Sequence, residues 1–455
     1  MLRAKNVDML HGNLFKTILI YSFPLFLISL IQNLFNAVDI MVLGYVADTD
    51  AVAAVGATSP ILHLLINAFF GISVGAKIVL ARLLGAQKHK RAAKTVSTSI
   101  ITALSLGLLT SLVGFLLAPL FLRLTNCPAE CFEGALIYMR IYVLSSPVIM
   151  IYNFGSAILH VSGDSQRPLY YMMISGGLNV VLNFVLCMII TEKVAAVAIA
   201  TVVSQIVGAV LVLARLFRMD GPCRLNLRAL HWSNSAFAKI MKNGIPIALS
   251  SALFPVANLQ IQSAINSFGA ATMAGNSAAI SLEALISTAT MTPWASATTV
   301  FVGQNLGAKD QVRVKNTILY TLALSVGLSL VLCNIGLLFS HQLLSLYVSE
   351  EAAIAAGRTR LFYVLLPYAI SAINSILSHV IQAFGYSLFS TINSIVSVLL
   401  FRMVWMTWIY PLSPTYACLC QCYLVSWFLI LIVNVSFTSY LYFGKLKKGL
   451  LTRMT

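Results

Sequence analysis

Charged residues are scarce in this sequence. Only 9% of the 455 residues are Asp, Glu, Lys or Arg, whereas 59% are hydrophobic and the mean hydropathy is +0.90. A soluble domain of this size could not bury so much apolar surface. The composition therefore excludes a soluble globular protein and indicates a membrane protein.

Common catalytic and nucleotide-binding motifs are also missing. The sequence has no HExxH motif, and its apolar stretches contain no pair of carboxylates, which argues against an intramembrane enzyme. It has no Walker A pattern either. Any pumping must therefore be driven by an ion gradient, and we expect the protein not to be an enzyme.

The eight cysteines form no recognisable metal-binding pattern. Cys418, Cys420 and Cys422 are spaced by two residues, which on a helix turns neighbours about 200° apart. Cys127 and Cys131 fall in one loop and could pair, an alternative that the spacing leaves open. We interpret the eight cysteines as structural and expect no cofactor other than a coupling ion, H⁺ or Na⁺.

Long apolar stretches, in contrast, occupy most of the chain. A spanning helix needs about 20 mainly apolar residues. About twelve such stretches lie roughly at 18–44, 57–80, 95–118, 136–159, 169–190, 195–216, 245–267, 277–301, 316–340, 361–382, 389–410 and 417–443. We therefore expect an all-α polytopic membrane protein with about twelve transmembrane helices. The N-terminus lacks the short apolar region and cleavage site of a secretory signal, so we expect it to stay in the mature protein.

The net charge of +16 could suggest nucleic acid binding, but the basic residues are distributed as in a membrane protein. If the twelve stretches alternate in direction, 22 of the 29 Lys and Arg fall on the side of the N-terminus. The other side holds Arg123, Arg140, Lys193, Arg358 and Arg360, while Lys77 and Arg402 fall within stretches. Basic residues collect on the cytoplasmic side. We predict a multi-pass cell membrane protein with both termini cytoplasmic and no nucleic acid partner.

The sequence repeats itself at a constant offset. LLGAQKHKRAAKT from Leu83 resembles NLGAKDQVRVKNT from Asn305, so that Gly85 plus 222 is Gly307. The same offset carries Pro24 to Pro246, Asn36 to Asn258 and Gly163 to Gly385. We predict an N-terminal six-helix lobe at 1–216, a basic cytoplasmic linker at 217–243 and a C-terminal six-helix lobe at 244–455. Because six is even, the repeats are parallel, as in one class of secondary transporters.

Four ionisable side chains fall within the apolar stretches. Lys77 is close to the cytoplasmic end of the second stretch and can extend to the headgroups. Asp39 is in the first, Glu283 is a turn or two inside the eighth, and Arg402 is near the middle of the eleventh. Such a group at a helix centre costs at least about 2.5–3.5 kcal/mol. Gln32, Asn36 and Asp39 share one helical stripe, which must face the protein interior or a wet cavity. We interpret Asp39 as a proton or cation site; a structural pairing with a buried donor such as Arg402 is the alternative.

Other stretches carry stripes of amides, which serve either as contacts between helices or as cavity walls. Asn179 and Asn183 lie in the fifth stretch, Asn258 and Gln262 in the seventh, and Asn374 in the tenth. The pattern leaves both interpretations open. As candidates for the wall of a substrate cavity we take Gln32, Asn258, Gln262, Asn374, Glu283 and Arg402.

Nine segments together resemble the multidrug and toxic compound extrusion (MATE) family, especially its bacterial, clostridial-type branch. They are SFPLFLISLIQNLFNAVDIMVLG, AVAAVGATSPI, VGAKIVLARLLGAQKHKRAAK, LHVSGDSQRPL, GLNVVLNFVL, AIATVVSQIVGA, IQSAINSFGA, VFVGQNLGAKDQVR and FRMVWMTWIYPLSPTYACL. The resemblance covers roughly residues 10–443 and keeps its order throughout. It implies a two-lobed fold of twelve helices and export of organic cations in exchange for H⁺ or Na⁺.

The resemblance also implies a cation site in the N-terminal lobe. Position by position, its residues are Asp39, Asn179, Asn183 and Thr201, and we expect Asn36 beside them. A carboxylate, two amides and a hydroxyl offer hard oxygen ligands that could hold Na⁺. Some relatives have an acid where this chain has Asn183, so a second negative charge is missing and we favour H⁺. Acids that others carry in the seventh and tenth helices are absent too, so we expect no cation site in the C-terminal lobe.

Two other functions compete with an antiporter of amphiphilic cations. A flippase for a lipid-linked saccharide would need several basic residues in its cavity to bind a pyrophosphate, and only Arg402 clearly qualifies. An intramembrane enzyme would need a motif such as HExxH or a pair of carboxylates in the apolar stretches, and the sequence has neither. We therefore expect a monomeric exporter of small organic molecules embedded in the lipid bilayer.

Overall fold

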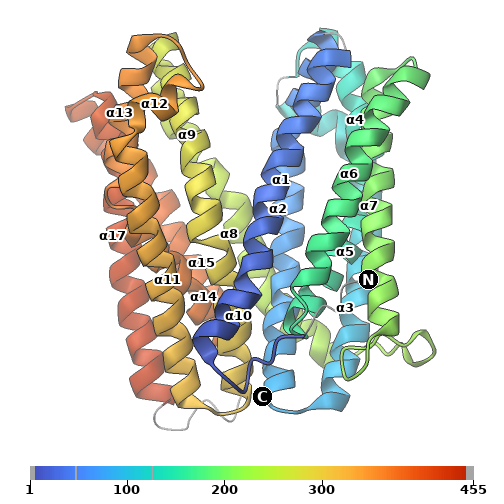
Figure 1. Cartoon of the computed structure of the whole chain (residues 1–455). Helices are drawn as coiled ribbons and strands as arrows, with labels where there is room; N and C mark the ends of the chain where they lie inside the picture. Colours follow the sequence, from blue (N-terminus) through green and yellow to red (C-terminus); the bar gives the residue numbers. More distant parts are fainter. Residues whose placement is uncertain (1–5, 47–48, 126, 447–455) are drawn as a thin grey trace. The chain divides into compact units, whose positions relative to one another are not determined.

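The structure, a computed structural model, describes the backbone of residues 6–46, 49–125 and 127–446. Within these ranges the described side chains leave out 33, 35–46, 49–52, 254–257, 259, 445 and 446. Asn36 and Asp39 therefore lie outside the described side chains. The described backbone is helical except for short connections (Figure 1), as expected of an all-α membrane protein.

The helices group into two compact units. The first unit contains residues up to Asp8 and Leu27–Ala248, and the second contains Met9–Phe26 and the residues from Leu249. This division does not coincide with the predicted boundaries at 216 and 244. The reason is that α1 (Leu14–Val46) and α8 (Asn234–Asn266) each contribute residues to both units. The rest of the first unit is built from α2 (Thr49–Gly85), α3 (His89–Leu124), α4 (Phe132–Leu144), α5 (Ser146–Val161), α6 (Gln166–Ile189) and α7 (Lys193–Arg218).

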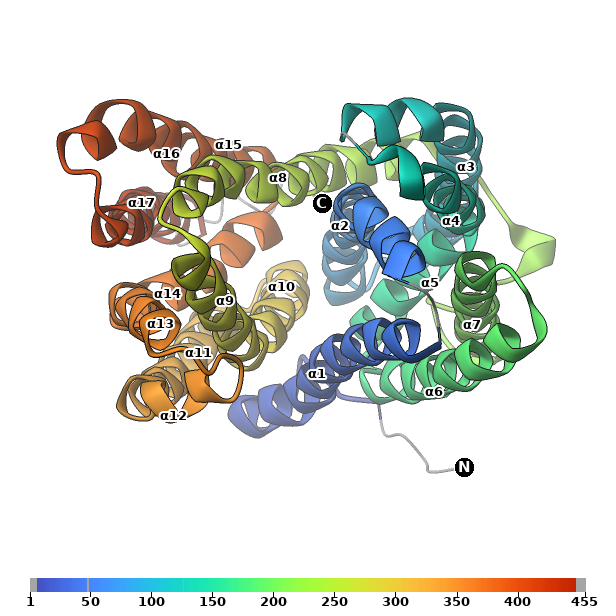
Figure 2. The same ribbon diagram turned by 90° about the horizontal axis from the view of Figure 1, so that it is seen from above.

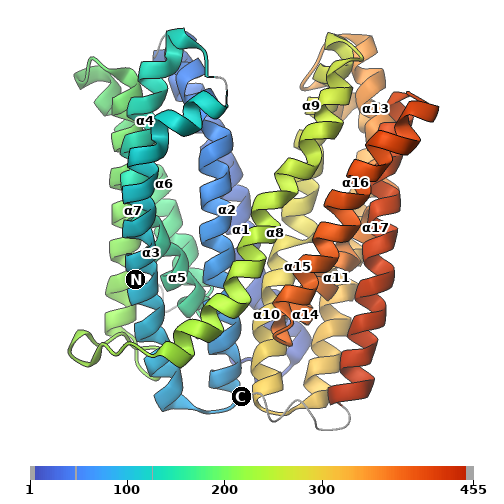
Figure 3. The ribbon, with the colours of Figure 1, turned by 180° about the vertical axis from the view of Figure 1, so that it is seen from behind.

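The second unit repeats this succession of helices. It contains α9 (Ala270–Thr290), α10 (Thr292–Gly307), α11 (Gln311–Leu338), α12 (Ser340–Ser345), α13 (Glu351–Leu365), α14 (Tyr368–Ala383), α15 (Ser387–Ser394), α16 (Phe401–Val404) and α17 (Tyr416–Ser439). Figure 3 shows α15 and α16 following one another beside α17. Short 3₁₀ turns occur at 129–131, 227–229 and 410–412, and π-helical segments occur at 395–400, 405–409 and 440–446.

All twelve predicted spans fall on these helices. Within the described residues, eight helices are long and apolar enough to cross a membrane, and two further spans are bent pairs. The bends are 45° between α4 and α5 and 49° between α13 and α14. The remaining predicted spans, 245–267 and 277–301, fall on α8 and on α9 with α10. The two bent pairs occupy equivalent places in the two units.

The repeat seen in the sequence recurs in the backbone. Gly163 and Gly385, which the offset of 222 relates, both have positive φ, +87° and +76°. Gln87 and Lys309 are related by the same offset and also have positive φ, 53° and 63°, although side chains rarely adopt that conformation. Left-handed backbone conformations therefore recur at the offset seen in the sequence, as expected of structural repeats.

Close helix packing in the first unit depends on two glycines. Residues 71–75 read GISVG and match the letters of the GxSxG nucleophile motif, but they lie in the middle of α2 and not at a strand-to-helix turn. A Cβ atom on Gly71 would lie 2.4 Å from the Cα of Ala248, and one on Gly75 would lie 2.4 Å from the carbonyl oxygen of Ile240. These glycines therefore let α2 approach the first part of α8.

Candidate functional site

The second unit contains a cavity of about 610 Å³ that is lined by both polar and apolar side chains. Helices α8, α9, α13, α14, α15, α16 and α17 contribute to its wall, and Figure 2 looks along several of them. Five of the six candidate substrate residues line it: Asn258, Gln262, Glu283, Asn374 and Arg402. The sixth, Gln32, is exposed and lies on α1 in the first unit. Five residues from four separate predicted spans therefore meet at one cavity.

An ion pair forms one side of the cavity. Arg360 donates from Nε to Oε1 of Glu283 at 2.7 Å and from NH2 to Oε2 at 3.0 Å. Its NH1 donates to the Oδ1 of Asn276 at 3.0 Å, and the Tyr416 hydroxyl donates to the same oxygen at 3.1 Å. The Arg360 side chain is 3% exposed and that of Glu283 is 14% exposed. This geometry is a bidentate pairing of a carboxylate with a guanidinium.

The close approach of two helices makes this ion pair possible. A Cβ atom on Gly275 of α9 would lie 2.0 Å from the carbonyl oxygen of Ala353 on α13. Gly357 lies on the same side of α13, and a Cβ atom there would lie 2.9 Å from the Gly275 carbonyl oxygen. Without side chains at these positions the two backbones pack directly together. Glu283 and Arg360, farther along the same helices, are thereby brought within hydrogen-bonding distance.

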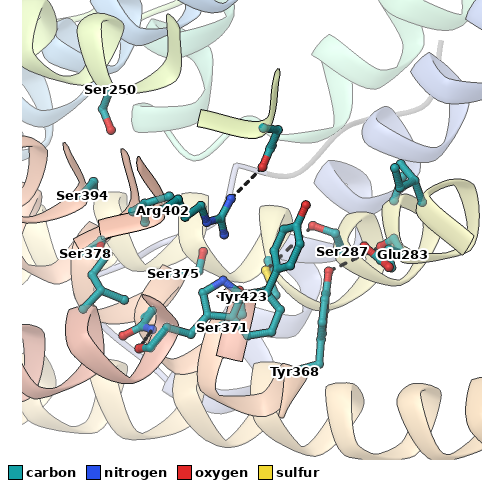
Figure 4. A pocket seen from close by; sticks show the side chains of 18 of the residues that line it. Ser250, Glu283, Ser287, Tyr368, Ser371, Ser375, Ser378, Ser394, Arg402 and Tyr423 are labelled. Atoms are coloured by element: carbon teal, nitrogen blue, oxygen red, sulfur yellow. Dashed lines mark hydrogen bonds between the residues drawn. The ribbon is translucent and has the colours of Figure 1, made fainter. Parts of the chain in front are cut away.

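A second guanidinium lies across Tyr423 from this pair. Arg402 donates from NH1 to the Oδ1 of Asn258 at 2.6 Å and from NH2 to the Ser426 hydroxyl at 3.4 Å. Its Cζ is 4.3 Å from the centre of the Tyr423 ring, and the Cζ of Arg360 is 4.9 Å from the same ring. Figure 4 shows Tyr423 between Arg402 and Glu283. The ring therefore separates the two cations and interacts favourably with both.

Arg402 is located where its helix changes geometry. The four residues of α16 are flanked by π-helical turns at 395–400 and 405–409. A π turn accommodates an extra residue, which changes the direction of the following side chains, and such turns are frequent at functional sites. The amphipathic pattern of an ordinary helix would not predict which way Arg402 points. The structure places it in the cavity wall, 1% exposed.

The amide candidates bond both to one another and to the backbone. Gln262 donates to the Oδ1 of Asn266 at 3.0 Å and accepts from Asn276 at 3.5 Å. Asn374 donates to the carbonyl oxygen of Trp427 at 2.8 Å. The same amides therefore serve both as contacts between helices and as part of the cavity wall.

In the first unit, three of the five predicted cation-site residues lie together. Asn179 donates to the Thr201 hydroxyl at 3.4 Å, and Asn183 donates to the Oδ1 of Asn179 at 3.4 Å. Asn179 is 6% exposed and Asn183 is fully buried, so this polar row between α6 and α7 lies inside the protein. Asp39 and Asn36 lie outside the described side chains, and their place beside this row remains a prediction.

Arg360 and Tyr423 are the site residues that the sequence analysis missed. The sequence predicts an outer-loop position for Arg360 because the apolar stretch begins at Leu361. In the structure, however, α13 begins at Glu351 and carries Arg360 into the protein. The signal that could have revealed it is Glu283, since an acid inside a span requires a partner. Tyr423 lies in α17 and has no charge that would require a partner, so it carries no such signal.

Cys127 and Cys131, whose pairing the sequence left open, are both free thiols with their sulfurs 4.0 Å apart. All eight cysteines are free, and seven of them are buried. This agrees with a structural role for the group.

Comparisons with known proteins agree with the architecture. The family model described as MatE matches residues 24–185 and 246–408, which begin at Pro24 and Pro246. The chain is 25% identical over 396 residues to the probable multidrug resistance protein YoeA of Bacillus subtilis, covering 85% of each chain. It is 20% identical over 382 residues to the multidrug export protein MepA of Staphylococcus aureus, covering 84% of each.

Solved structures show the same fold. A MOP superfamily transporter from Pyrococcus furiosus matches with a TM-score of 0.88 at 23% identity, over 97% of this chain and 99% of that one. An outward-facing multidrug resistance MATE family transporter matches with a TM-score of 0.87 at 24% identity, over 98% of this chain and 99% of that one. The likeness covers both repeats and nearly every described helix.

Proposed function

This chain belongs to the MATE family of multidrug efflux transporters, and from that premise we propose that it is an antiporter exporting amphiphilic organic compounds, cations in particular, in exchange for protons. Members of the family are transporters and not enzymes. The observation that carries the proposal is a family match repeated in both halves, together with a cavity in the second unit whose wall combines polar and apolar side chains. YoeA and MepA are both named for multidrug resistance or export.

The proposed coupling group is Asp39, assisted by Asn36, Asn179, Asn183 and Thr201. Four of these five side chains are neutral, so one negative charge is available. A single proton balances one carboxylate, whereas a firmly held Na⁺ would benefit from the second acid that Asn183 replaces. Na⁺ coupling through the same oxygen atoms is the alternative that the experiment must separate.

We expect ethidium to accumulate in everted membrane vesicles when their lumen is made acidic at constant Na⁺. Protons leaving the lumen would drive the dye inward, which corresponds to export from a cell. Dissipating the pH gradient with ammonium should release the dye, and a Na⁺ gradient at constant pH should not replace it. Accumulation that follows Na⁺ and ignores pH would reverse the choice of ion, and accumulation under neither gradient would refute the antiporter.

A flippase for a lipid-linked saccharide gains one argument from Arg360, which adds a second guanidinium to the cavity wall. Glu283 neutralises that charge, however, through two hydrogen bonds. A pyrophosphate carries more negative charge than the one net positive charge of the described wall can balance. The efflux antiporter is therefore the better supported function.

We further propose that the protein is a monomer in the cell membrane, with both termini and the basic linker 217–243 on the cytoplasmic side. The reason for this orientation is that 22 of 29 basic residues collect on that side under simple alternation.

This orientation predicts that Asn226→Cys will react with an impermeant maleimide only after cells are permeabilised. Asn226 is exposed, and the background variant Cys127→Ser removes the half-buried thiol expected on the outside. The nearby Cys223 should not react with the maleimide, because burial raises the pKa of its thiol to about 12 and leaves almost no reactive thiolate. Labelling of Asn226→Cys from outside intact cells would reverse the topology.

A further inference from the structure

The segment that connects the two repeats carries exposed apolar side chains. This connecting segment (219–233) follows α7 and precedes α8. Its Leu227, Leu230 and Trp232 are 62%, 37% and 46% exposed, although the segment lies outside the predicted spans. Large apolar side chains that gather on one stretch of surface mark a place where another apolar surface docks. The question is which surface covers them.

Hydrogen bonds hold the connecting segment to the first unit near both of its ends. The N–H of Leu225 donates to the carbonyl oxygen of Leu216 on α7 at 2.9 Å, and the Leu225 side chain is buried. The hydroxyl of Thr98 on α3 donates to the carbonyl oxygen of His231 at 3.4 Å. The same hydroxyl accepts from the N–H of Ser233 at 3.2 Å. The segment is therefore fixed in place on α3 and α7.

These two attachment points lie at the edge of the membrane. Leu216 is the last residue of the predicted span 195–216, and Thr98 is the fourth residue of the predicted span 95–118. Figures 1 and 3 show the connecting segment extending sideways beside α3, short of the lower end of that helix. The segment is therefore held level with the ends of two spans, where the headgroups of the bilayer lie, and not farther out in the water.

A 3₁₀ turn separates the apolar side chains of the connecting segment from its polar ones. The turn covers 227–229, and side chains three residues apart lie over one another in such a turn. Leu227 and Leu230 therefore project from one face, whereas Asn226 and Ala229 share another. A segment with separate apolar and polar faces is suited to lying in the plane of the membrane surface.

The charges around the apolar face fit a negatively charged surface. Arg224 and Arg228 are exposed on the connecting segment, and Lys239 and Lys242 are exposed on the first turns of α8. Against these four basic residues the same part of the chain has one acid, Asp220. Tryptophan is enriched at membrane interfaces, and basic residues near the surface attract anionic headgroups.

We propose that the connecting segment lies in the headgroup layer of the bilayer and binds anionic lipids. Leu227, Leu230 and Trp232 insert toward the acyl chains, and Arg224 and Arg228 bind phosphate groups, which match the planar fork of a guanidinium. This proposal goes beyond export and does not depend on it. It describes a lipid-binding surface at the junction of the two repeats.

The test measures how deeply two positions of the connecting segment lie in a bilayer. Leu227→Cys and Ala229→Cys are spin-labelled separately in full-length protein that carries Cys127→Ser, which removes the half-buried thiol. The protein is held in nanodiscs of phosphatidylglycerol with one copy in each. Collisions with oxygen, which concentrates in lipid, are compared with collisions with a nickel chelate, which stays in water. We expect the label at 227 to lie about 5–10 Å into the boundary between headgroups and acyl chains, and the label at 229 to lie in water.

A change of lipid and a change of charge test the role of the arginines. In nanodiscs of phosphatidylcholine, the label at 227 should lie closer to water than in phosphatidylglycerol. Replacing both Arg224 and Arg228 by Gln should abolish this difference between the lipids. Combining Arg123→Gln with Arg358→Gln removes the same number of charges from exposed positions elsewhere and should preserve the difference.

A label at 227 that meets the nickel chelate as often as the label at 229 would overturn the proposal. Equal depths of the label at 227 in the two lipids would refute binding of anionic headgroups. Insertion that appears only in nanodiscs with two copies would identify a contact between copies of the chain instead. Because no ion gradient is applied, these outcomes are separate from the antiporter, whose failure would appear as absent ethidium accumulation in vesicles.

Discussion

Replacing Asp39 by asparagine is expected to abolish gradient-driven ethidium accumulation in everted vesicles while the protein remains folded and inserted. Asparagine has nearly the size and the hydrogen-bonding capacity of aspartate but cannot take up or release a proton. The described part of the predicted site, Asn179, Asn183 and Thr201, is neutral. Without Asp39 the site would have no titratable group, and export should fall to the level of vesicles without the protein.

Asp220→Asn is the matched control, because it removes the same charge from an exposed loop position. It should accumulate dye like the wild type. If Asp39→Asn still moves ethidium against its gradient, Asp39 is not the coupling group. If the variant fails to insert or to elute as a folded protein, Asp39 is instead a structural partner of some buried donor.

The second large effect is expected at the ion pair of the cavity wall. Arg360→Met should lower the apparent stability of the purified protein by about 3–5 kcal/mol, because it leaves the largely buried carboxylate of Glu283 without its guanidinium. The substitution also removes the bond to Asn276 and the contact with Tyr423. Thermal unfolding in detergent, followed by intrinsic fluorescence, measures the loss as a lower melting temperature.

A double-mutant cycle separates the ion pair from other effects of the substitution. Combining Arg360→Met with Glu283→Gln should restore part of the lost stability, because no uncompensated charge remains. Arg358→Met, on the exposed face of the same helix, should leave the melting temperature nearly unchanged. Strictly additive losses in the double variant would show that Glu283 and Arg360 do not stabilise one another.

Hydropathy and repeat register predicted the large features of the fold because they report on local chemistry. An apolar stretch must be helical in a bilayer, so all twelve stretches fall on helices. The offset of 222 relates two pairs of residues with positive φ, one of which, Gln87 and Lys309, the sequence did not single out. Polar groups inside a span cannot face lipid. For this reason the sequence predicts one shared cavity wall for Asn258, Gln262, Asn374, Glu283 and Arg402, which line the same cavity in the structure.

The pairing of charges was not predictable in the same way. Arg360 adjoins the end of an apolar stretch, where an arginine can extend to the headgroups or turn inward, and hydropathy does not distinguish the two. The decision depends on the approach of α9 to α13 through Gly275 and Gly357. That approach is a tertiary contact between segments about 80 residues apart. The π turns around Arg402 likewise change its direction in a manner that helical periodicity does not encode.

The division between the two compact units falls within α1 after Phe26 and within α8 after Ala248. Each point is two residues beyond a proline, Pro24 or Pro246, whose ring removes a backbone hydrogen bond from the helix. Because both helices continue through the division, a rotation of one unit against the other has to be absorbed as bending along α1 and α8. Bending requires least energy where a hydrogen bond is already absent. The repeat thus places a missing backbone hydrogen bond in each of the two helices, just before the point where the chain passes from one unit to the other.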